Sequence, residues 1–328
     1  MKELTTCLES ENGSIKHSFF YDQSDNIEHA HNDCKVVIEN AGKSKNAKGW
    51  NNYPVYISKN NRDWEKTEEY NYDKGAYSFV LPLEYFYASW FPTYSYDKLQ
   101  YFIKSMGLTC NLLRNETPYL MFGSFTKPTI VITARQHPGE SMASFTAEGI
   151  ISEIIEHNKE LLQFFSFIIF PMLNVDGVKN LNHRYNSEGV DLNRDWKDSK
   201  SNAVKNVKAF LKHANIIPFA FFDIHGDEVS KLNYVIPKRA KKGRSNIENS
   251  FFKDDFIVIS SRPSLRKLIK RMVKRNKYSS NQNSARHYFA SVGFDSFTLE
   301  LSAHACTPEK CKEIGSNLIR SLLAKVRQ

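Results

Sequence analysis

Residues 129–141 read Thr-Ile-Val-Ile-Thr-Ala-Arg-Gln-His137-Pro-Gly-Glu140-Ser, an apolar run of strand type that ends in a histidine and a glutamate. Three further apolar runs alternate with longer stretches of helical pattern: 167–173, 219–224 and 297–301. Runs that are buried on both faces and linked by helices indicate a largely parallel α/β sheet. Because such sheets hold their ligands at the C-terminal ends of the strands, His137 and Glu140 lie where a site is expected.

The part of the chain before this sheet has a different pattern. Residues 1 to about 110 are rich in aromatic residues and Asn, and short alternating apolar runs are separated by polar turns: 35–39, 53–57 and 77–81. This pattern predicts an antiparallel β-sandwich. The boundary falls in a segment that we predict to be helical as far as about Leu113. We therefore predict an N-terminal β-sandwich domain over 1–112 and an α/β domain with a mixed, mainly parallel sheet over 113–328.

The composition excludes several classes of protein. Of the 328 residues, 41% are hydrophobic and 25% charged, which supports a buried core and excludes a disordered or collagen-like chain. No run approaches the ~20 apolar residues of a membrane span, and the N-terminus lacks the apolar region of a secretory signal. Five scattered cysteines form neither a disulfide framework nor a zinc finger. We expect a soluble, cytoplasmic protein.

Three residues at strand ends have the chemistry of metal ligands. His137 and Glu140, three residues apart in a turn, can reach one cation together. A catalytic zinc typically takes three protein ligands and leaves a fourth position to water. His225 directly follows another apolar run and is the third candidate. A lone histidine is more often a hydrogen-bonded core or loop residue, but two histidines and a glutamate in this setting favour a metal site.

Two further features suit catalysis. Asn193 and Arg194 offer adjacent donors, and a guanidinium fork fits a carboxylate in bidentate fashion; the alternative is a helix cap beside a surface arginine. Glu300 ends the apolar run Phe-Thr-Leu-Glu, where a buried charge is costly unless it is paired or functional. It is a candidate general base, and the alternative is a salt bridge at the edge of the core.

Taken together, these motifs resemble the zinc metallocarboxypeptidases of the carboxypeptidase A clan, and more narrowly the cytosolic carboxypeptidase subfamily. The resemblance rests on motifs that agree in order and approximate spacing along nearly the whole chain: Ala134-Arg-Gln-His-Pro-Gly-Glu140, Asn174-Val-Asp-Gly177, Gly189-Val-Asp-Leu-Asn-Arg194, His225, Thr298-Leu-Glu300 and, in the first domain, Trp90-Phe-Pro-Thr-Tyr-Ser-Tyr96. It implies a β-sandwich followed by a carboxypeptidase-like α/β domain.

The resemblance also implies a cofactor and the residues that hold it. One Zn²⁺ per chain would be bound by His137, Glu140 and His225. Asp191 matches the carboxylate that orients the first histidine ligand through its other ring nitrogen.

On the substrate side, the resemblance implies roles for four further residues. Arg184 lies where the family has the arginine that stabilises the oxyanion. Asn193 and Arg194 match the pair that grips the terminal carboxylate of the substrate. Glu300 matches the general base that takes a proton from the attacking water.

Two residues bear on specificity. Arg286 in Ser-Ala-Arg resembles the arginine that lines the pocket for the C-terminal side chain in the subfamily, where it favours acidic residues. The alternative is a solvated residue at a helix start. Tyr278, upstream of Glu300, matches the position of the mobile tyrosine that covers the substrate in pancreatic enzymes, although a loop tyrosine usually just packs.

The positive charge of the chain raises the question of its partners. There are 45 Lys and Arg against 36 Asp and Glu, a net charge of +9. Residues 262–277 hold eight Lys or Arg and no acid at amphipathic spacing, which predicts a helix with a cationic face. Such a face is most simply a solvated surface. An acidic polypeptide substrate is the next alternative, and nucleic acid is the least favoured because no binding module accompanies the charge.

The sequence therefore predicts a zinc-dependent metallocarboxypeptidase that removes C-terminal residues, acidic ones such as glutamate, from peptides or protein tails. Two other functions remain open. A zinc amidohydrolase or deacylase of the same fold could act on small carboxylate-bearing amides. A catalytically silent binding module could retain the fold, but it would be free to lose Glu300 or a metal ligand.

Overall fold

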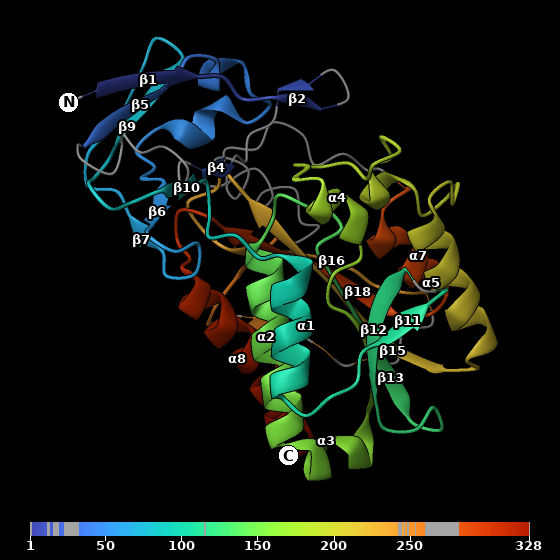
Figure 1. Cartoon of the computed structure of the whole chain (residues 1–328). Helices are drawn as coiled ribbons and strands as arrows, with labels where there is room; N and C mark the ends of the chain where they lie inside the picture. The colour runs from blue at the N-terminus through green and yellow to red at the C-terminus, as the bar shows by residue number, and fades with distance from the viewer. Residues whose placement is uncertain are drawn as a thin grey trace.

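The computed structural model describes residues 2–327 except 12–13, 16–19, 23–32, 115, 242–244, 246, 248, 253 and 260–281. Tyr278 and the predicted cationic helix over 262–277 lie outside the described residues. Figure 1 shows an N-terminal group of strands set above a larger body of helices and strands. The β-sandwich followed by an α/β domain, as predicted, is confirmed.

Among its described residues, the N-terminal part contains two four-stranded sheets and one two-stranded sheet. The first has the order β1 (Lys2–Thr6), β5 (Cys34–Ile38), β9 (Ala76–Leu81), β8 (Tyr70–Asp73). The second has the order β4 (Phe20–Asp22), β10 (Tyr87–Ser89), β6 (Tyr56–Ser58), β7 (Glu65–Lys66). β2 (Ser10–Glu11) and β3 (Ser14–Ile15) pair with each other.

Strand directions follow the prediction with one exception. The pairs are antiparallel except β1 and β5, which run parallel. The chain between these two strands is long enough for the crossover that a parallel pair needs. Both sheets contribute to one core, which includes Val36 and Phe79 from the first sheet and Ile57 and Ala88 from the second.

The segment between the N-terminal sheets and the large sheet is only partly helical. α1 (Tyr96–Ser105) begins after Ser95, whose side chain accepts a hydrogen bond from the backbone N–H of Lys98. The helix does not continue to Leu113 as predicted, because the chain turns at Gly107, which has a φ of +70°. Residues 111–113 form a strand instead. The exact division between the two domains, placed after residue 112, stays a prediction.

The second part is built on an eight-stranded sheet. Its order is β11 (Asn111–Leu113), β12 (Thr117–Phe122), β14 (Ser166–Phe170), β13 (Pro128–Ala134), β15 (Ile217–Asp227), β18 (Asp295–Ser302), β16 (Tyr234–Lys238), β17 (Ile257–Val258). β14, β13, β15 and β18 are parallel neighbours, and β12 and β16 flank them in the antiparallel direction. The four apolar runs of the sequence are these four central strands, so the mainly parallel sheet is confirmed.

Helices cover both faces of this sheet (Figure 1). One face packs against α2 (Met142–Glu156) and α8 (Pro308–Val326), the other against α5 (Asn202–His213) and α7 (Ala285–Ser291). α2 and α8 approach closely at Gly149, where a Cβ atom would lie 2.0 Å from the carbonyl oxygen of Lys312. Among the described residues, no helix is long and apolar enough to cross a membrane. The shorter helices are α3 (Asn158–Phe164), α4 (Val175–Lys179), η2 (Ala41–Lys43), η3 (Ala47–Trp50), η4 (Leu192–Arg194) and η5 (Asn249–Phe252).

Candidate active site

The C-terminal ends of the central strands bring the predicted residues together. β13 and β15 are paired with Ala134 opposite Ile224, so the turn after β13 meets His225 directly. β15 and β18 are paired with His225 opposite Glu300. Partners in a parallel pair project from the same face of the sheet, and Glu300 therefore lies one strand away from His225. Both are buried, with 1% of His225 and 8% of Glu300 exposed.

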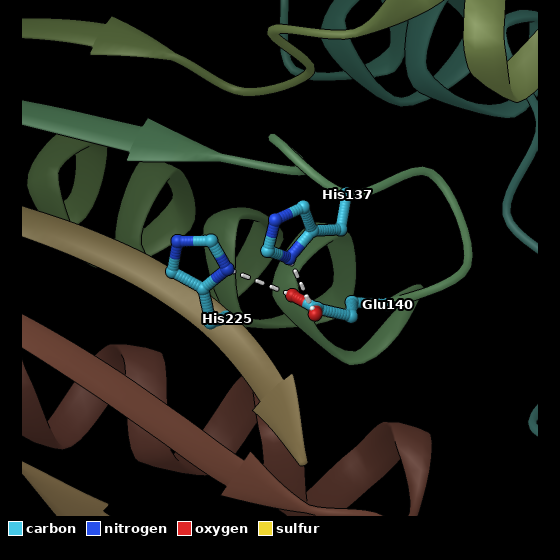
Figure 2. A group of neighbouring side chains, drawn as sticks. All are labelled: His137, Glu140 and His225. Atoms are coloured by element: carbon cyan, nitrogen blue, oxygen red, sulfur yellow. Dashed lines mark hydrogen bonds and ion pairs between the residues drawn. The ribbon is translucent and has the colours of Figure 1, made fainter. Parts of the chain in front are cut away.

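His137, Glu140 and His225, which we call the His-Glu-His cluster, point toward one another (Figure 2). The Oε1 atom of Glu140 lies 2.7 Å from Nδ1 of His137, and its Oε2 atom lies 2.8 Å from Nδ1 of His225. The possible ligand atoms all lie within 4.8 Å of one another. Gly226 donates its backbone N–H to Oε2 of Glu140 at 3.0 Å. A Cβ atom on Gly226 would meet the Glu140 side chain at 3.2 Å, so glycine allows this approach.

The outward nitrogens of both imidazoles face carboxylates. Nε2 of His137 lies 3.2 Å from Asp191, and Nε2 of His225 lies 3.1 Å from Asp223. An ionised carboxylate only accepts hydrogen bonds, so these contacts favour a proton on Nε2 and direct the lone pair of Nδ1 into the cluster. Two imidazole nitrogens and one carboxylate, each with its outer partner, are the donor set of a catalytic zinc.

The pKa values describe a site with strong internal charges. Burial would raise the pKa of Glu140, but the neighbouring imidazoles of His137 and His225 hold it well below its usual range. Burial would lower the pKa of His225, but the carboxylates of Asp223 and Glu140 raise it well above its usual range. A carboxylate this deeply buried needs a positive partner. A divalent cation among the three donors supplies one, and the cluster therefore fits a metal.

Asp191 links the cluster to Arg184. Its Oδ1 atom faces His137, and its Oδ2 atom accepts from Nε and Nη2 of Arg184 at 2.8 and 2.7 Å. Burial would raise the pKa of Asp191, but His137 and Arg184 lower it. One carboxylate thus holds both the imidazole and the guanidinium in fixed orientations.

Asn193 contacts His225, and Arg194 follows it in the chain. Asn193 is buried, its Nδ2 atom lies 3.0 Å from Nε2 of His225, and its Oδ1 atom accepts from the backbone N–H of Ala285 at 3.0 Å. Arg194 is exposed, and its Nη1 atom donates to the carbonyl of Asn193 at 2.8 Å. Arg286, at the start of α7, donates to the carbonyl of Ile236 at 3.2 Å. The contact between Ala285 and Asn193 ties the start of α7 to the cluster.

Sequence reasoning assigned no role to Asp223 or Gln136. Asp223 is fully buried, and its Oδ1 atom accepts from Thr133 at 2.8 Å and from Gln136 at 2.6 Å. A signal was present, because Asp223 and His225 are two residues apart in a strand, where alternate side chains share a face. Contacts from the N-terminal domain had no such signal. Asn46 of that domain donates to Glu228 at 2.8 Å, across 182 positions of sequence.

Comparisons with known proteins agree with this architecture. Residues 122–312 match the family model of the zinc carboxypeptidases, and residues 2–96 match that of the cytosolic carboxypeptidase N-terminal domain. The chain belongs to the zinc carboxypeptidase family. Members of this family use a zinc ion, and the His-Glu-His cluster is a buried site of suitable composition.

Relatives match over part of their length. The chain is 28% identical over 208 residues to an uncharacterized protein of Zymomonas mobilis, a match that covers 59% of this chain and 55% of that protein. It is 40% identical over 114 residues to cytosolic carboxypeptidase 4 of Homo sapiens, which covers 32% of this chain and 10% of the human protein. The matches thus span about half of one curated relative and a tenth of the other.

Solved structures of similar proteins share the fold over nearly the whole chain. A metallo-carboxypeptidase from Pseudomonas aeruginosa has a TM-score of 0.79 at 19% identity, over 99% of this chain and 94% of that chain. A metallo-carboxypeptidase from Burkholderia cenocepacia has a TM-score of 0.77 at 22% identity, over 98% of this chain and 93% of that chain. At this identity the likeness establishes the fold.

Proposed function

We propose that this protein is a zinc-dependent carboxypeptidase that removes C-terminal residues, acidic ones such as glutamate, from peptides or protein tails. The observation that carries this proposal is the convergence of the His-Glu-His cluster with Glu300, which lies opposite His225 in the sheet, and with Asn193, which contacts His225. Membership of the zinc carboxypeptidase family supports it. The names of the cytosolic carboxypeptidase relatives favour a cytoplasmic location.

The cluster and Glu300 carry out the chemical step. His137, Glu140 and His225 would hold the zinc ion, which would polarise the scissile carbonyl and lower the pKa of a water molecule to about 7. Glu300 takes a proton from the attacking water and passes it to the leaving amine. The register of β15 and β18, with Glu300 opposite His225, supports this role.

Arginine side chains bind the substrate. Arg184, oriented by Asp191, donates to the carbonyl oxygen as it becomes negative, and one such donor is commonly worth roughly 3 kcal/mol. Arg194 and Asn193 grip the free carboxylate at the end of the substrate. An internal peptide bond has no such carboxylate, which accounts for removal of terminal residues only.

Acid selectivity follows from Arg286. Its helix start is tied to Asn193 through the backbone N–H of Ala285, which supports a position for Arg286 near the terminal residue of the substrate. Burial, Arg286 and Lys238 together lower the pKa of His287 to about 4, so two cations gather around a neutral imidazole here. A glutamate side chain would pair with these charges, and a lysine or arginine would be repelled.

The activity is tested with the zinc-loaded protein and a panel of peptides. We expect release of the C-terminal residue, fastest for glutamate, from a set that includes poly-glutamate peptides. Glu300→Gln should retain stoichiometric zinc and lose about 10²–10⁴-fold in kcat. Zinc-loaded protein that releases no residue from the panel would contradict the proposal. Hydrolysis of N-acyl amino acids but of no peptide would favour an amidohydrolase instead.

Acid selectivity is tested separately through Arg286→Asp. This change replaces attraction for an acidic side chain by repulsion, so the preference should shift toward basic C-terminal residues by at least about tenfold. The ratio of kcat/KM for matched peptides ending in Glu and Lys is the measurement. Lys212→Asp, an equal change of charge on the exposed face of α5, is the control. An unchanged ratio in Arg286→Asp would remove this residue from the pocket.

A further inference from the structure

The segment 41–50 of the N-terminal domain reaches the candidate active site. Ser44 is buried, its hydroxyl donates to the carbonyl of Ala41 at 2.7 Å, and it accepts from the indole N–H of Trp50 at 3.0 Å. Asn46 donates to Glu228 of the catalytic domain at 2.8 Å. Lys45 lies between these two anchored residues. Its backbone is therefore fixed at the junction of the domains.

The charges around Lys45 are those of the candidate active site. Partial burial and the guanidinium of Arg184 lower the pKa of Lys45, and the charge of Arg194 lowers it further. Asp191 and Glu228 act in the opposite direction. Three cations from two domains thus act on one another here, and Asp191 and Glu228 offset part of their repulsion.

The acids in this group are already engaged. Asp191 faces His137 and Arg184. Glu228 accepts from Asn46, and its Oε1 atom lies 3.6 Å from Nε2 of His183. Lys45 is exposed, and among the residues that the structure describes its ammonium has no ion-pair or hydrogen-bond partner. The arrangement therefore offers a cation to an anionic group that comes from outside.

The position of Lys45 indicates which part of a substrate would carry that anion. Arg286 belongs to a different group of charges, with Lys238 and His287. In the proposed function Arg286 meets the side chain of the terminal residue, Arg194 its free carboxylate and Arg184 the scissile carbonyl. An acidic side chain that reaches Lys45, near both Arg184 and Arg194, then belongs to the residue on the other side of the scissile bond.

We propose that Lys45, beside Arg184 and Arg194, binds the side-chain carboxylate of the penultimate residue of the substrate and so forms a subsite for it. The subsite rests on the proposed function and extends it from the last residue to a pair of acidic residues. It also assigns a role in specificity to the N-terminal domain. An exposed ion pair contributes up to about fivefold in affinity, and we expect a preference of that size for Glu over Gln.

The test uses two peptides that differ only in a penultimate Glu or Gln and that share the terminal residue released fastest. Two quantities are measured with zinc-loaded protein: kcat/KM for the active form, and the dissociation constant for the Glu300→Gln form by fluorescence anisotropy. Lys45→Ala removes the charge, and Lys45→Arg keeps it. Lys48→Ala removes an exposed lysine from the same segment and is the matched control.

We expect the Glu-to-Gln ratio of about five to fall to near one in Lys45→Ala and to persist in Lys45→Arg and Lys48→Ala. For the Gln peptide, kcat/KM and the dissociation constant should each change by less than about twofold in Lys45→Ala. A ratio that is already one in the unmodified protein, that survives Lys45→Ala, or that falls equally in Lys48→Ala would overturn the subsite. Binding with a Lys45-dependent preference but without cleavage would contradict the proposed function and leave the subsite standing.

Discussion

The core of the N-terminal domain and the edge of the catalytic sheet bury polar groups in different ways. The N-terminal core is aromatic, and its polar atoms are neutral. Tyr53 donates to the carbonyl of Trp90 at 2.7 Å, and Tyr77 donates to the carbonyl of Tyr53 at 2.7 Å. Burial raises the pKa of both tyrosines, which keeps them uncharged. These hydrogen bonds fix the shape of the backbone and cost little, because each donor replaces water by a carbonyl.

The edge of the catalytic sheet instead buries charged and titratable groups. Glu140, Asp223 and His225 are each less than 10% exposed, and His225 contacts both carboxylates. Such groups are expensive to desolvate and are found where a ligand or a reaction uses them. We therefore expect damage to the N-terminal core to lower the stability of the fold, and damage to the edge of the catalytic sheet to lower metal binding and activity.

Trp50→Ala is the change with the largest expected effect on stability. The indole is fully buried, lies 4.8 Å from the rings of both Tyr77 and Trp90, and donates to Ser44. Truncation leaves a cavity and removes the hydrogen bond to the Ser44 hydroxyl, and should lower the free energy of unfolding by about 3–5 kcal/mol. Urea denaturation of the zinc-loaded protein measures it.

The control for this change is Tyr101→Ala, which removes an aromatic side chain that is 77% exposed on α1. It should alter the free energy of unfolding by less than about 0.5 kcal/mol. Folded Trp50→Ala should still bind one zinc per chain. Loss of zinc from Trp50→Ala that remains folded would contradict the expectation that damage to the N-terminal core lowers stability alone.

Much of the difference between the N-terminal domain and the catalytic sheet edge could be predicted from the sequence. The four apolar runs marked the central strands, and the histidines and carboxylates at their ends marked the sheet edge, because both patterns are local. The helix predicted as far as Leu113 was wrong, since Gly107 turns the chain after Ser105 and periodicity alone does not locate such a turn. The β-sandwich was recognised, but the parallel pairing of β1 and β5 depends on the path of a long connection.

The contacts between the domains could not be predicted in this way. The bond from Asn46 to Glu228 depends on how two separately folded parts fit together, and no spacing in the sequence encodes that fit. Lys45 was one of many lysines in a basic chain until the bond from its neighbour Asn46 to Glu228 placed this segment at the candidate active site. Residues that bind metal have a chemical signature, whereas residues that border a substrate from another domain have only a position.

Asp223→Asn tests the second region, with an effect of intermediate size. The substitution keeps the volume of the side chain but weakens the carboxylate contact that orients Nε2 of His225. Loss of such a partner typically weakens metal affinity 10–100-fold, and we expect that range for zinc. Competition with a chelator measures it, and Asp198→Asn at an exposed position is the control. Unchanged zinc affinity in Asp223→Asn would mean that the carboxylate serves only to hold Thr133 and Gln136.

The smallest expected effect lies where the two regions meet, at His304. Its ring lies 4.8 Å from that of Tyr53 in the N-terminal domain, and Nζ of Lys231 lies 2.6 Å from its Nδ1 atom. A lysine donates only to a neutral imidazole. Burial and the charge of Lys231 lower the pKa of His304 from 6.5 to about 4.

The sign of the resulting pH dependence follows from proton binding. Between pH 6.5 and 4 the unfolded chain carries a proton on this histidine and the folded chain does not, so folding becomes less favourable as the pH falls through this window. His304→Gln, which can still accept a hydrogen bond from Lys231, should reduce the acid-induced loss of folding free energy by about 1–2 kcal/mol. This is less than the full pKa shift of His304 would give, because the ring is partly exposed and solvent screens its charge. Urea denaturation of metal-free protein at pH 7.5 and 4.5 measures the difference.

Metal-free protein is needed because zinc binding itself depends on pH. The ligands of the cluster take up protons in acid, and the stability that bound zinc contributes would then change with pH as well. Burial likewise lowers the pKa of His183 and His287, but both histidines are present in each protein and cancel in the comparison. His213→Gln, at an exposed position near the end of α5, should leave the pH dependence as it is. If the free energy of unfolding falls equally between pH 7.5 and 4.5 in His304→Gln and in the unmodified protein, protonation of His304 does not oppose folding. The junction of the domains would then tolerate a buried charge, as the edge of the catalytic sheet does.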